Sequence, residues 1–430
     1  MASFFREIAV VLTPDFSSPL LGMKFPLIVL GSLLPFVLAD FPGDIVAFWN
    51  ERATFALNAS SPRLSSLREG YYGALVQTTV LKASDDSQGL SRNTRQLALS
   101  HAAHDILTTI FPAQYRNIDA YLREAEDQIR ASVQEARRGR EIGERAVART
   151  VDARAGDGVA KYIRYDFKAP APGVYQGTPP TNGIPADPNG PFIKPFGGVK
   201  QLPVWIAPPD VRSESYIAHL QRIKEKGARV NSTRTAEETE IGYYWLESSI
   251  TYWNRFARAI VGNSLSADIS KSAKFFAQLN WAIANAGTIG FDAKHRYNSW
   301  RPITALRWTE PFLFGGADLS DPTWEPLVTT PVHQDYLSGH AVYGSSAGGI
   351  IAHFLGTDTI DPPVTLSSTV TLDNIGVLTR TYRNVSTAVK ENGDSRVFVG
   401  VHFQFASDEG NKAGQRAADD VWRQDAKGYL

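Results

Sequence analysis

The sequence predicts an all-α protein in which two bundles of helices pack together and are joined by long crossings rich in proline and glycine. Three observations support this fold class. Apolar residues recur at steps of three and four over most of the chain, and few segments alternate as strands do. One stretch, residues 166–211, is too rich in proline and glycine to be helical.

The first helical region runs from about residue 43 to residue 165. Within it, AAHDILTTIFP (102–112) has apolar residues at helical spacing and ends at Pro112. Residues 116–155 mix charges with Ile, Leu and Val, which predicts one amphipathic helix or a pair of helices with a solvated charged face.

The crossing at 166–211 carries large apolar side chains, so it is expected to pack against the body of the protein. These side chains are Phe192, Phe196, Val204, Trp205 and Ile206. Helical patterns return at 212–226 and 235–290 and dominate from residue 294 onward. The predicted organisation is an N-terminal helical region with the crossing (40–211) and a C-terminal helical domain (212–430) that carries the functional site.

The residues before Asp40 are typical of an exported protein. From Met23 the chain reads MKFPLIVLGSLLPFVLA before Asp40, so a lysine, an apolar run and a small residue predict a signal peptide cleaved after Ala39. Residues 1–22 are then an N-terminal extension, and an uncleaved membrane anchor is the alternative. No later segment is long and apolar enough to span a bilayer. The prediction is a secreted protein.

Three N-x-[ST] sequons, at Asn58, Asn231 and Asn384, agree with secretion and predict a glycoprotein. The 44 basic and 44 acidic residues give a formal net charge of zero, so no nucleic-acid partner is expected. Any anion site must therefore be a local concentration of cations. The absence of cysteine excludes disulfides, thiolate chemistry, zinc–thiolate sites and iron–sulfur clusters.

The first candidate site segment is FDAKHRYNSWRP, which contains Lys294 and Arg301. On a helix, a seven-residue step is about two turns, so both cations are expected on one face, converging on a small anion. Pro302 is expected to end or kink this helix and to leave the guanidinium at its edge. Taken alone, such a pair is more often two solvated surface charges than an anion site.

The second segment, LSGHAVYGSSAGGIIAHF, places Ser338, Gly339 and His340 before an apolar helical run. Free N–H groups and the positive end of the helix dipole favour an anion there. Ser338 can donate a hydrogen bond, Gly339 permits close backbone approach, and His340 can act as acid or base. Gly344 and Gly348 predict close helix packing. An ordinary N-cap beside a bystander histidine is the alternative.

The third segment is SRVFVGVHFQF, in which Arg396 and His402 flank a buried apolar stretch. An arginine is rarely buried without an anionic partner. A histidine in such a segment is also compatible with a satisfied core residue. By contrast, His101 and His104 have the spacing of a zinc pair without an evident third ligand, and a place in the helix core is expected for them.

Together, K-x6-R-P, SGH and S-R-x5-H resemble the pattern of the vanadium haloperoxidase and type 2 phosphatidic acid phosphatase superfamily. AAHDILTTIFP, the GTPP crossing and DAKHRYNSWRPITALR are similar to its soluble vanadium haloperoxidase branch. The resemblance covers most of residues 45–420. It implies a haloperoxidase that oxidises halide with hydrogen peroxide at a His402-bound vanadate, modifying an organic acceptor; phosphate is expected to fit the same site.

The resemblance also implies a role for each residue. His402 is the vanadium ligand, or the nucleophile that forms a phosphohistidine in the phosphatases. The cations Lys294, Arg301 and Arg396 neutralise the oxyanion, Ser338 and the Gly339 N–H donate hydrogen bonds to it, and Lys294 polarises bound peroxide. His340 is the acid–base. Both vanadate and a phosphoryl-transfer transition state need such preorganised positive charge.

Two positions bear on the halide. His333 matches a histidine of algal bromoperoxidases where the fungal chloroperoxidase has phenylalanine, and this favours bromide or iodide over chloride. Phe291 stands in the place of a tryptophan near the chloride site of the chloroperoxidase. A solvent-exposed loop position for His333 is the alternative.

Two departures bear on the alternative functions. Leu337 replaces a proline before SGH. Ala406 stands where phosphatases carry an aspartate that activates the histidine, and Asp408 lies two residues further on. The missing aspartate weakens, without removing, the alternative of an acid phosphatase or diphosphatase. A non-catalytic oxyanion-binding homologue is the remaining alternative.

Overall fold

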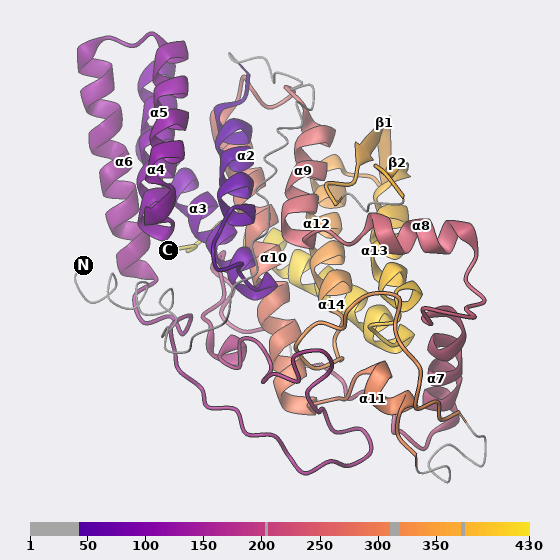
Figure 1. Cartoon of the computed structure of the whole chain (residues 1–430). Helices are drawn as coiled ribbons and strands as arrows, with labels where there is room; N and C mark the ends of the chain where they lie inside the picture. The colour runs from indigo at the N-terminus through magenta and orange to yellow at the C-terminus, as the bar shows by residue number, and fades with distance from the viewer. Residues whose placement is uncertain (1–42, 203–204, 310–318, 371–374) are drawn as a thin grey trace, which may run out of the picture.

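The regular secondary structure is almost entirely helical, as Figure 1 shows for a computed structural model that describes residues 43–202, 205–309, 319–370 and 375–430. In chain order the elements are α2 (Ile45–Asn58), α3 (Ser66–Asp86), α4 (Arg92–Ile110), η1 (Pro112–Gln114), α5 (Tyr115–Ile129), α6 (Val133–Ala153), η2 (Gly190–Phe192), α7 (Glu214–Lys226), α8 (Ala236–Tyr244), α9 (Ser249–Val261), α10 (Ile269–Tyr297), α11 (Pro302–Leu306), α12 (Gly339–Leu355), β1 (Thr359–Ser367), β2 (Thr379–Asn384), α13 (Val385–Phe398) and α14 (Gln404–Gln424). The all-α prediction is confirmed. The predicted extension and signal peptide lie outside the described residues.

The N-terminal bundle consists of α2 to α6, with α4 packed against α3, α5 and α6. The region predicted as one or two amphipathic helices is a pair. It breaks at Arg130, which has a left-handed φ of 44°, and restarts with a capping box in which Ser132 and Glu135 bond reciprocally. α4 ends at Ile110, two residues before Pro112, as the sequence predicts.

The long helix α10 joins this bundle to the C-terminal one, because it packs against α3 on one side and against α12 and α14 on the other. Its side chains are buried over most of its length. One core cluster includes Leu75 from α3, Ile283 from α10 and Val385 from α13. The two predicted regions thus share a core, and their division at residue 211 stays a prediction.

Close packing of α12 against α13 and α14 brings the candidate site segments together. A Cβ atom at Gly348 would meet the Val389 side chain, and one at Gly414 would meet the Val342 carbonyl oxygen. Gly344 is similarly crowded by Asn392, so the predicted close packing is confirmed. As a result the start of α12, the end of α13 and the start of α14 meet at one end of the bundle.

The proline-rich crossing has no helix beyond the single 3-10 turn η2 among its described residues. Phe196 and Trp205 are buried, as predicted, whereas Phe192 and Ile206 are exposed; Val204 lies outside the described residues. The crossing is fastened to the C-terminal domain by backbone groups. The Phe196 N–H donates to Asn285 Oδ1 at 2.8 Å.

The sequence did not predict the antiparallel pair β1–β2, in which Val364 lies opposite Tyr382. This hairpin packs against α9 and α13, away from the site segments. Among the described helices, none combines the length and apolarity needed to cross a bilayer.

Candidate active site

Lys294 lies near the end of α10 and is 1% exposed. Its Nζ donates to the carbonyl oxygens of Gln334 (2.8 Å), Asp335 (3.0 Å) and Leu337. Burial, with a contribution from the nearby Arg301, lowers the pKa of Lys294 well below its usual range. All three N–H groups of an ammonium are therefore engaged by the loop that leads into α12, which Lys294 holds in place.

Arg301 is not on the same helix as Lys294, so that prediction is wrong. α10 ends at Tyr297, because Asn298 takes a left-handed conformation with φ 47° and caps the helix. Arg301 is extended, and Pro302 begins α11 instead of ending a helix. The two cations reach the same site because the chain turns at Asn298.

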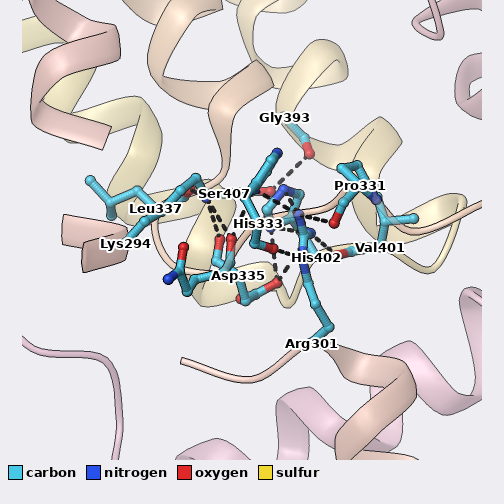
Figure 2. Close-up of polar contacts among 11 residues, drawn as sticks. Lys294, Arg301, Pro331, His333, Asp335, Leu337, Gly393, Val401, His402 and Ser407 are labelled. Atoms are coloured by element: carbon cyan, nitrogen blue, oxygen red, sulfur yellow. Dashed lines mark hydrogen bonds and ion pairs between the residues drawn. The ribbon is translucent and has the colours of Figure 1, made fainter. Parts of the chain in front are cut away.

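The Arg301 guanidinium is completely buried and connects three segments, as Figure 2 shows. It donates to the carbonyl oxygens of His333 (2.7 Å) and Val401 (2.5 Å). Its Nη1 also lies 3.3 and 3.2 Å from the two ring nitrogens of His402. Burial lowers the pKa of Arg301 to about 10, which leaves it charged at neutral pH.

The start of α12 has donors without an acceptor among the residues that the structure describes. Ser338 is the N-cap residue, but its side chain makes no capping bond and its buried Oγ has no partner. Its backbone N–H donates to Ala406 O at 3.0 Å. The first helical bond runs from Val342 to Ser338, so the N–H groups of the intervening turn, including that of Gly339, are left for a ligand.

Arg396 lies in the last turn of α13 and is 5% exposed. Its Nε and Nη1 are buried without a hydrogen-bond partner, and no carboxylate of the described residues forms an ion pair with it. Burial, aided by Arg301, lowers its pKa to about 9. Such a cation is expensive to bury unless an anion joins it.

His402 follows the turn after α13 and is buried at the centre of the cluster in Figure 2. Burial and the neighbouring cations lower its pKa well below 6.5, so the ring is neutral. Its Nδ1 lies 2.9 Å from Oδ1 of Asp335, a completely buried carboxylate. Burial raises the pKa of Asp335 to about 7, against the opposing effect of Arg301 and Lys294.

Sequence reasoning did not find Asp335. Its contact with His402 spans 67 residues of sequence, so no local spacing reveals it. The available signal was a carboxylate three residues before Ser338 in a segment that is otherwise buried and mostly uncharged.

His340 is half-buried at the start of α12, with Nε2 3.0 Å from the Trp245 carbonyl oxygen. A carbonyl only accepts, so Nε2 carries the proton and Nδ1 has a free lone pair. Burial, with Arg396 nearby, lowers the pKa of His340 well below 6.5.

His333 is not a free loop histidine. Its ring lies 5.9 Å from that of Phe291 and 6.3 Å from that of His402, centroid to centroid. Its Nδ1 lies 2.9 Å from Arg301 Nη2, which only donates, and 3.0 Å from the Gln334 carbonyl oxygen, which only accepts, so these two contacts favour opposite tautomers of the ring. Phe291 and His333, the two positions predicted to influence the choice of halide, therefore lie next to Arg301 and His402.

The residues present fit a multiply charged oxyanion. Three buried cations face one carboxylate, and Ser338 Oγ and two Arg396 nitrogens are donors without acceptors. The part of the chain that the structure describes holds no group of three His, Asp or Glu side chains arranged for a bare metal ion. The set suits an anion such as vanadate or phosphate, which brings its own oxygens.

Comparison with known proteins agrees with this geometry. The family described as the VCPO second helical-bundle domain matches residues 274–428, which include every predicted site residue. Vanadium chloroperoxidase of Curvularia inaequalis is 26% identical over 319 residues, 55% of this chain and 52% of that protein. The chain is similar to the vanadium haloperoxidases in its C-terminal region.

The vanadium haloperoxidase fold extends to most of the chain. A bacterial vanadium-dependent iodoperoxidase superposes with a TM-score of 0.68 at 18% identity, covering 88% of this chain and 96% of the other. A bacterial vanadium-dependent chloroperoxidase in its holo form gives 0.65 at 14% identity, with 84% and 94% covered. The chain spans about half the length of the curated vanadium chloroperoxidase that it matches.

Proposed function

We propose that this protein is a vanadium-dependent haloperoxidase that oxidises halide with hydrogen peroxide and transfers the halogen to an organic acceptor. The observation that carries the proposal is the excess of buried cations around a neutral His402 in a vanadium haloperoxidase fold. That arrangement is unfavourable without an anion and favourable with vanadate.

Each side chain has a task that its position supports. His402 offers one ring nitrogen as the ligand to vanadium, because the other faces Asp335. Arg396 and Ser338 have unpaired donors for the anion's oxygens, and the Gly339 N–H adds a backbone donor. Arg301 places positive charge beside His402. Lys294 acts mainly through the loop that it holds, and by its charge.

The net reaction balances with one peroxide. Halide, hydrogen peroxide and a proton give hypohalous acid and water; the halide loses two electrons and the peroxide O–O bond accepts them. Bound vanadate supplies a Lewis-acidic centre that activates peroxide while the metal keeps its oxidation state. His340 accepts a proton from peroxide at Nδ1, the nitrogen that Trp245 leaves free.

We also propose bromide or iodide as the preferred halide. His333 lies against Phe291 and beside the His402 ring, so its imidazole is placed to influence a halide or peroxide bound there. One of the similar structures is that of an iodoperoxidase. A His333→Phe variant is expected to lose bromide and iodide turnover relative to chloride turnover.

A phosphatase with the same fold is the second candidate function. The contact between Asp335 and His402 supports this candidate more strongly than the sequence pattern does. The absence of an aspartate at position 406 argued for an unassisted His402. Asp335 supplies a carboxylate at Nδ1 from another segment, so a phosphohistidine mechanism retains its activating group. The third candidate is an oxyanion-binding protein without turnover.

Paired assays on one purified sample separate these functions. The first follows bromination of a phenolic dye with peroxide, bromide and orthovanadate, and the second follows p-nitrophenyl phosphate hydrolysis without vanadate. His402→Ala is the test variant. His353→Ala is the matched control, because His353 lies at the far end of α12 and pairs with Asp419.

Vanadate-dependent bromination that His402→Ala abolishes and His353→Ala retains is the expected result. Phosphate release that vanadate inhibits, without bromination, would replace the peroxidase by the phosphatase. Phosphate binding with neither activity would leave the non-catalytic homologue.

We further propose that the protein is secreted and glycosylated. The sequons at Asn58 and Asn231 lie at exposed positions, whereas Asn384 is half-buried at the start of α13. Expression in a eukaryotic host followed by glycosidase treatment is expected to show a mass shift from the first two. A secreted product without glycan at either would contradict this part.

A further inference from the structure

His402 can serve the proposed function only if the correct ring nitrogen is free. A neutral imidazole has one N–H and one lone pair, and only the nitrogen with the lone pair can bind vanadium or attack phosphorus. We propose that Asp335 is the positioning residue that fixes the proton of His402 on Nδ1 and leaves Nε2 bare. This inference rests on the proposed role of His402 as the oxyanion ligand.

The contact is geometrically suited to that role. Asp335 Oδ1 lies 2.9 Å from His402 Nδ1, and both side chains are buried. The backbone of Asp335 is held on both sides: its N–H donates to Ser299 O at 3.0 Å, and its carbonyl oxygen accepts from Lys294 at 3.0 Å. The carboxylate therefore presents a fixed acceptor to the ring.

The other neighbour of the ring cannot make this choice. Arg301 Nη1 lies at nearly equal distances, 3.3 and 3.2 Å, from Nδ1 and Nε2. A guanidinium only donates, so it favours a lone pair on either nitrogen without selecting one. A carboxylate only accepts and therefore selects the tautomer with the proton on Nδ1. Histidine ligands are commonly fixed in this way by a carboxylate at the second nitrogen.

The carboxylate beside His402 does not come from the segment that follows His402, where the related phosphatases carry an aspartate. Ala406 cannot supply a carboxylate, and its carbonyl oxygen accepts from the Ser338 N–H. Asp408 is exposed and accepts from Gln404 at 2.9 Å, so it is turned to the surface. The loop before α12, which Lys294 organises, brings the carboxylate to His402 instead. Lys294 thus supports the site through Asp335 as well as through its charge.

The second oxygen of Asp335 shows that the residue does more than neutralise charge. Oδ2 makes no hydrogen bond to a side chain of the described residues, the backbone N–H of Phe403 supports the carboxylate, and the nearest cation, Arg301, lies 3.9 Å from Oδ1. A carboxylate placed only to pair with a cation forms a closer, two-oxygen contact. Here the shortest side-chain contact is the one with the histidine.

The most direct test reads the tautomer of His402 in the unaltered, vanadate-free protein. Nitrogen-15 NMR of histidine-labelled protein distinguishes a protonated from a bare ring nitrogen, and loss of one signal in His402→Gln assigns the residue. The expected result is a protonated Nδ1 and a bare Nε2. A proton on Nε2 would overturn the proposal.

A second test changes the acceptor. In Asp335→Asn the amide can donate as well as accept, so the preference for a proton on Nδ1 is expected to weaken or reverse. Affinity for orthovanadate and orthophosphate, measured by calorimetry, is expected to fall by about 10- to 100-fold, as for other groups that orient a ligand. Asp408→Asn is the matched control, with unchanged tautomer and affinity.

Unchanged tautomer and anion affinity in a folded Asp335→Asn protein would overturn the positioning role. A fall in thermal stability with an unmoved tautomer would also overturn it, since that is the signature of a structural carboxylate. None of these readouts uses halide or peroxide. Failure of the bromination assay would therefore reject the peroxidase while leaving the Asp335 result to stand by itself.

Discussion

Two clusters of buried charged side chains, one around Arg154 and one around Arg396, are built differently. Beside α3 and α6, Arg154 lies 2.6 Å from Asp157, and that carboxylate also accepts from the Tyr71 hydroxyl at 2.8 Å. Arg154 donates further to the carbonyl oxygens of Pro195 and Lys194. One cation meets one anion there, and the carboxylate oxygens are both engaged.

The candidate active site has three buried cations and one carboxylate. Lys294 and Arg301 are held by carbonyl oxygens, whereas Arg396 keeps two nitrogens without a partner. The charges of the first cluster balance within the protein, although Arg154 Nε has no hydrogen-bond partner among the described residues, whereas the second cluster has an excess of cations that only an anion offsets. The difference indicates that the Arg154 cluster stabilises the fold and the Arg396 cluster binds a ligand.

The largest expected change in the free energy of unfolding is at the Arg154 cluster. Arg154→Met leaves Asp157 buried without its cation, so the free energy of unfolding is expected to fall by about 3–5 kcal/mol. Urea denaturation in a buffer free of phosphate measures it. Anion affinity is expected to stay unchanged, and a loss of phosphate binding in a folded variant would erase the distinction between the clusters.

Arg396→Met is expected to behave in the opposite way. Removal of a buried cation without a partner relieves its desolvation, so the anion-free protein is expected to keep its stability or to gain about 1 kcal/mol. The same urea titration measures this. A loss of several kcal/mol would show that Arg396 has a structural partner and that the second cluster is not unbalanced.

The smallest expected change in stability concerns His104, a partly exposed histidine of the N-terminal bundle that contacts Asp105 and Asp119. Burial lowers the pKa of His104, but hydrogen bonds to Asp105 and Asp119 outweigh it, and the net pKa is raised. The protonated ring therefore stabilises the fold below the unfolded value of about 6.5, and this contribution is lost as the pH rises through the folded-state pKa.

His104→Gln is accordingly expected to cost about 0.5–1 kcal/mol at low pH, near 5.5, and less near pH 8.5. Thermal or urea unfolding of variant and wild type at both pH values measures the difference. An equal cost at both pH values would show that the ring acts by packing alone.

Much of the fold and most of the site could be predicted from local patterns. Helical periodicity and capping residues lie close together in sequence, and so do the residues of SGH and S-R-x5-H. The predicted pair of helices over 116–155 and the close packing at Gly344 and Gly348 follow from such local rules. The same local reasoning treated the charges of 116–155 as solvated, and missed that Arg154 is buried against the crossing.

The errors arise where local spacing is ambiguous or contacts are distant. Lys294 and Arg301 are separated by a step that fits two helical turns, and the left-handed Asn298 that ends the helix has a weak sequence signal. The hairpin was missed because β1 contains Pro362 and Pro363, which strands usually avoid. Asp335 was missed because its partner lies in another segment.

The cluster of Lys294, Arg301 and Arg396, which has more cations than carboxylates, is expected to bind an oxyanion. Isothermal titration of orthophosphate into the wild-type protein and into Arg396→Met tests it most directly. One phosphate is expected to bind per chain of the wild type, with a loss of about 2–5 kcal/mol of binding free energy in the variant. Absence of binding in the wild type, or equal affinity in both proteins, would contradict it.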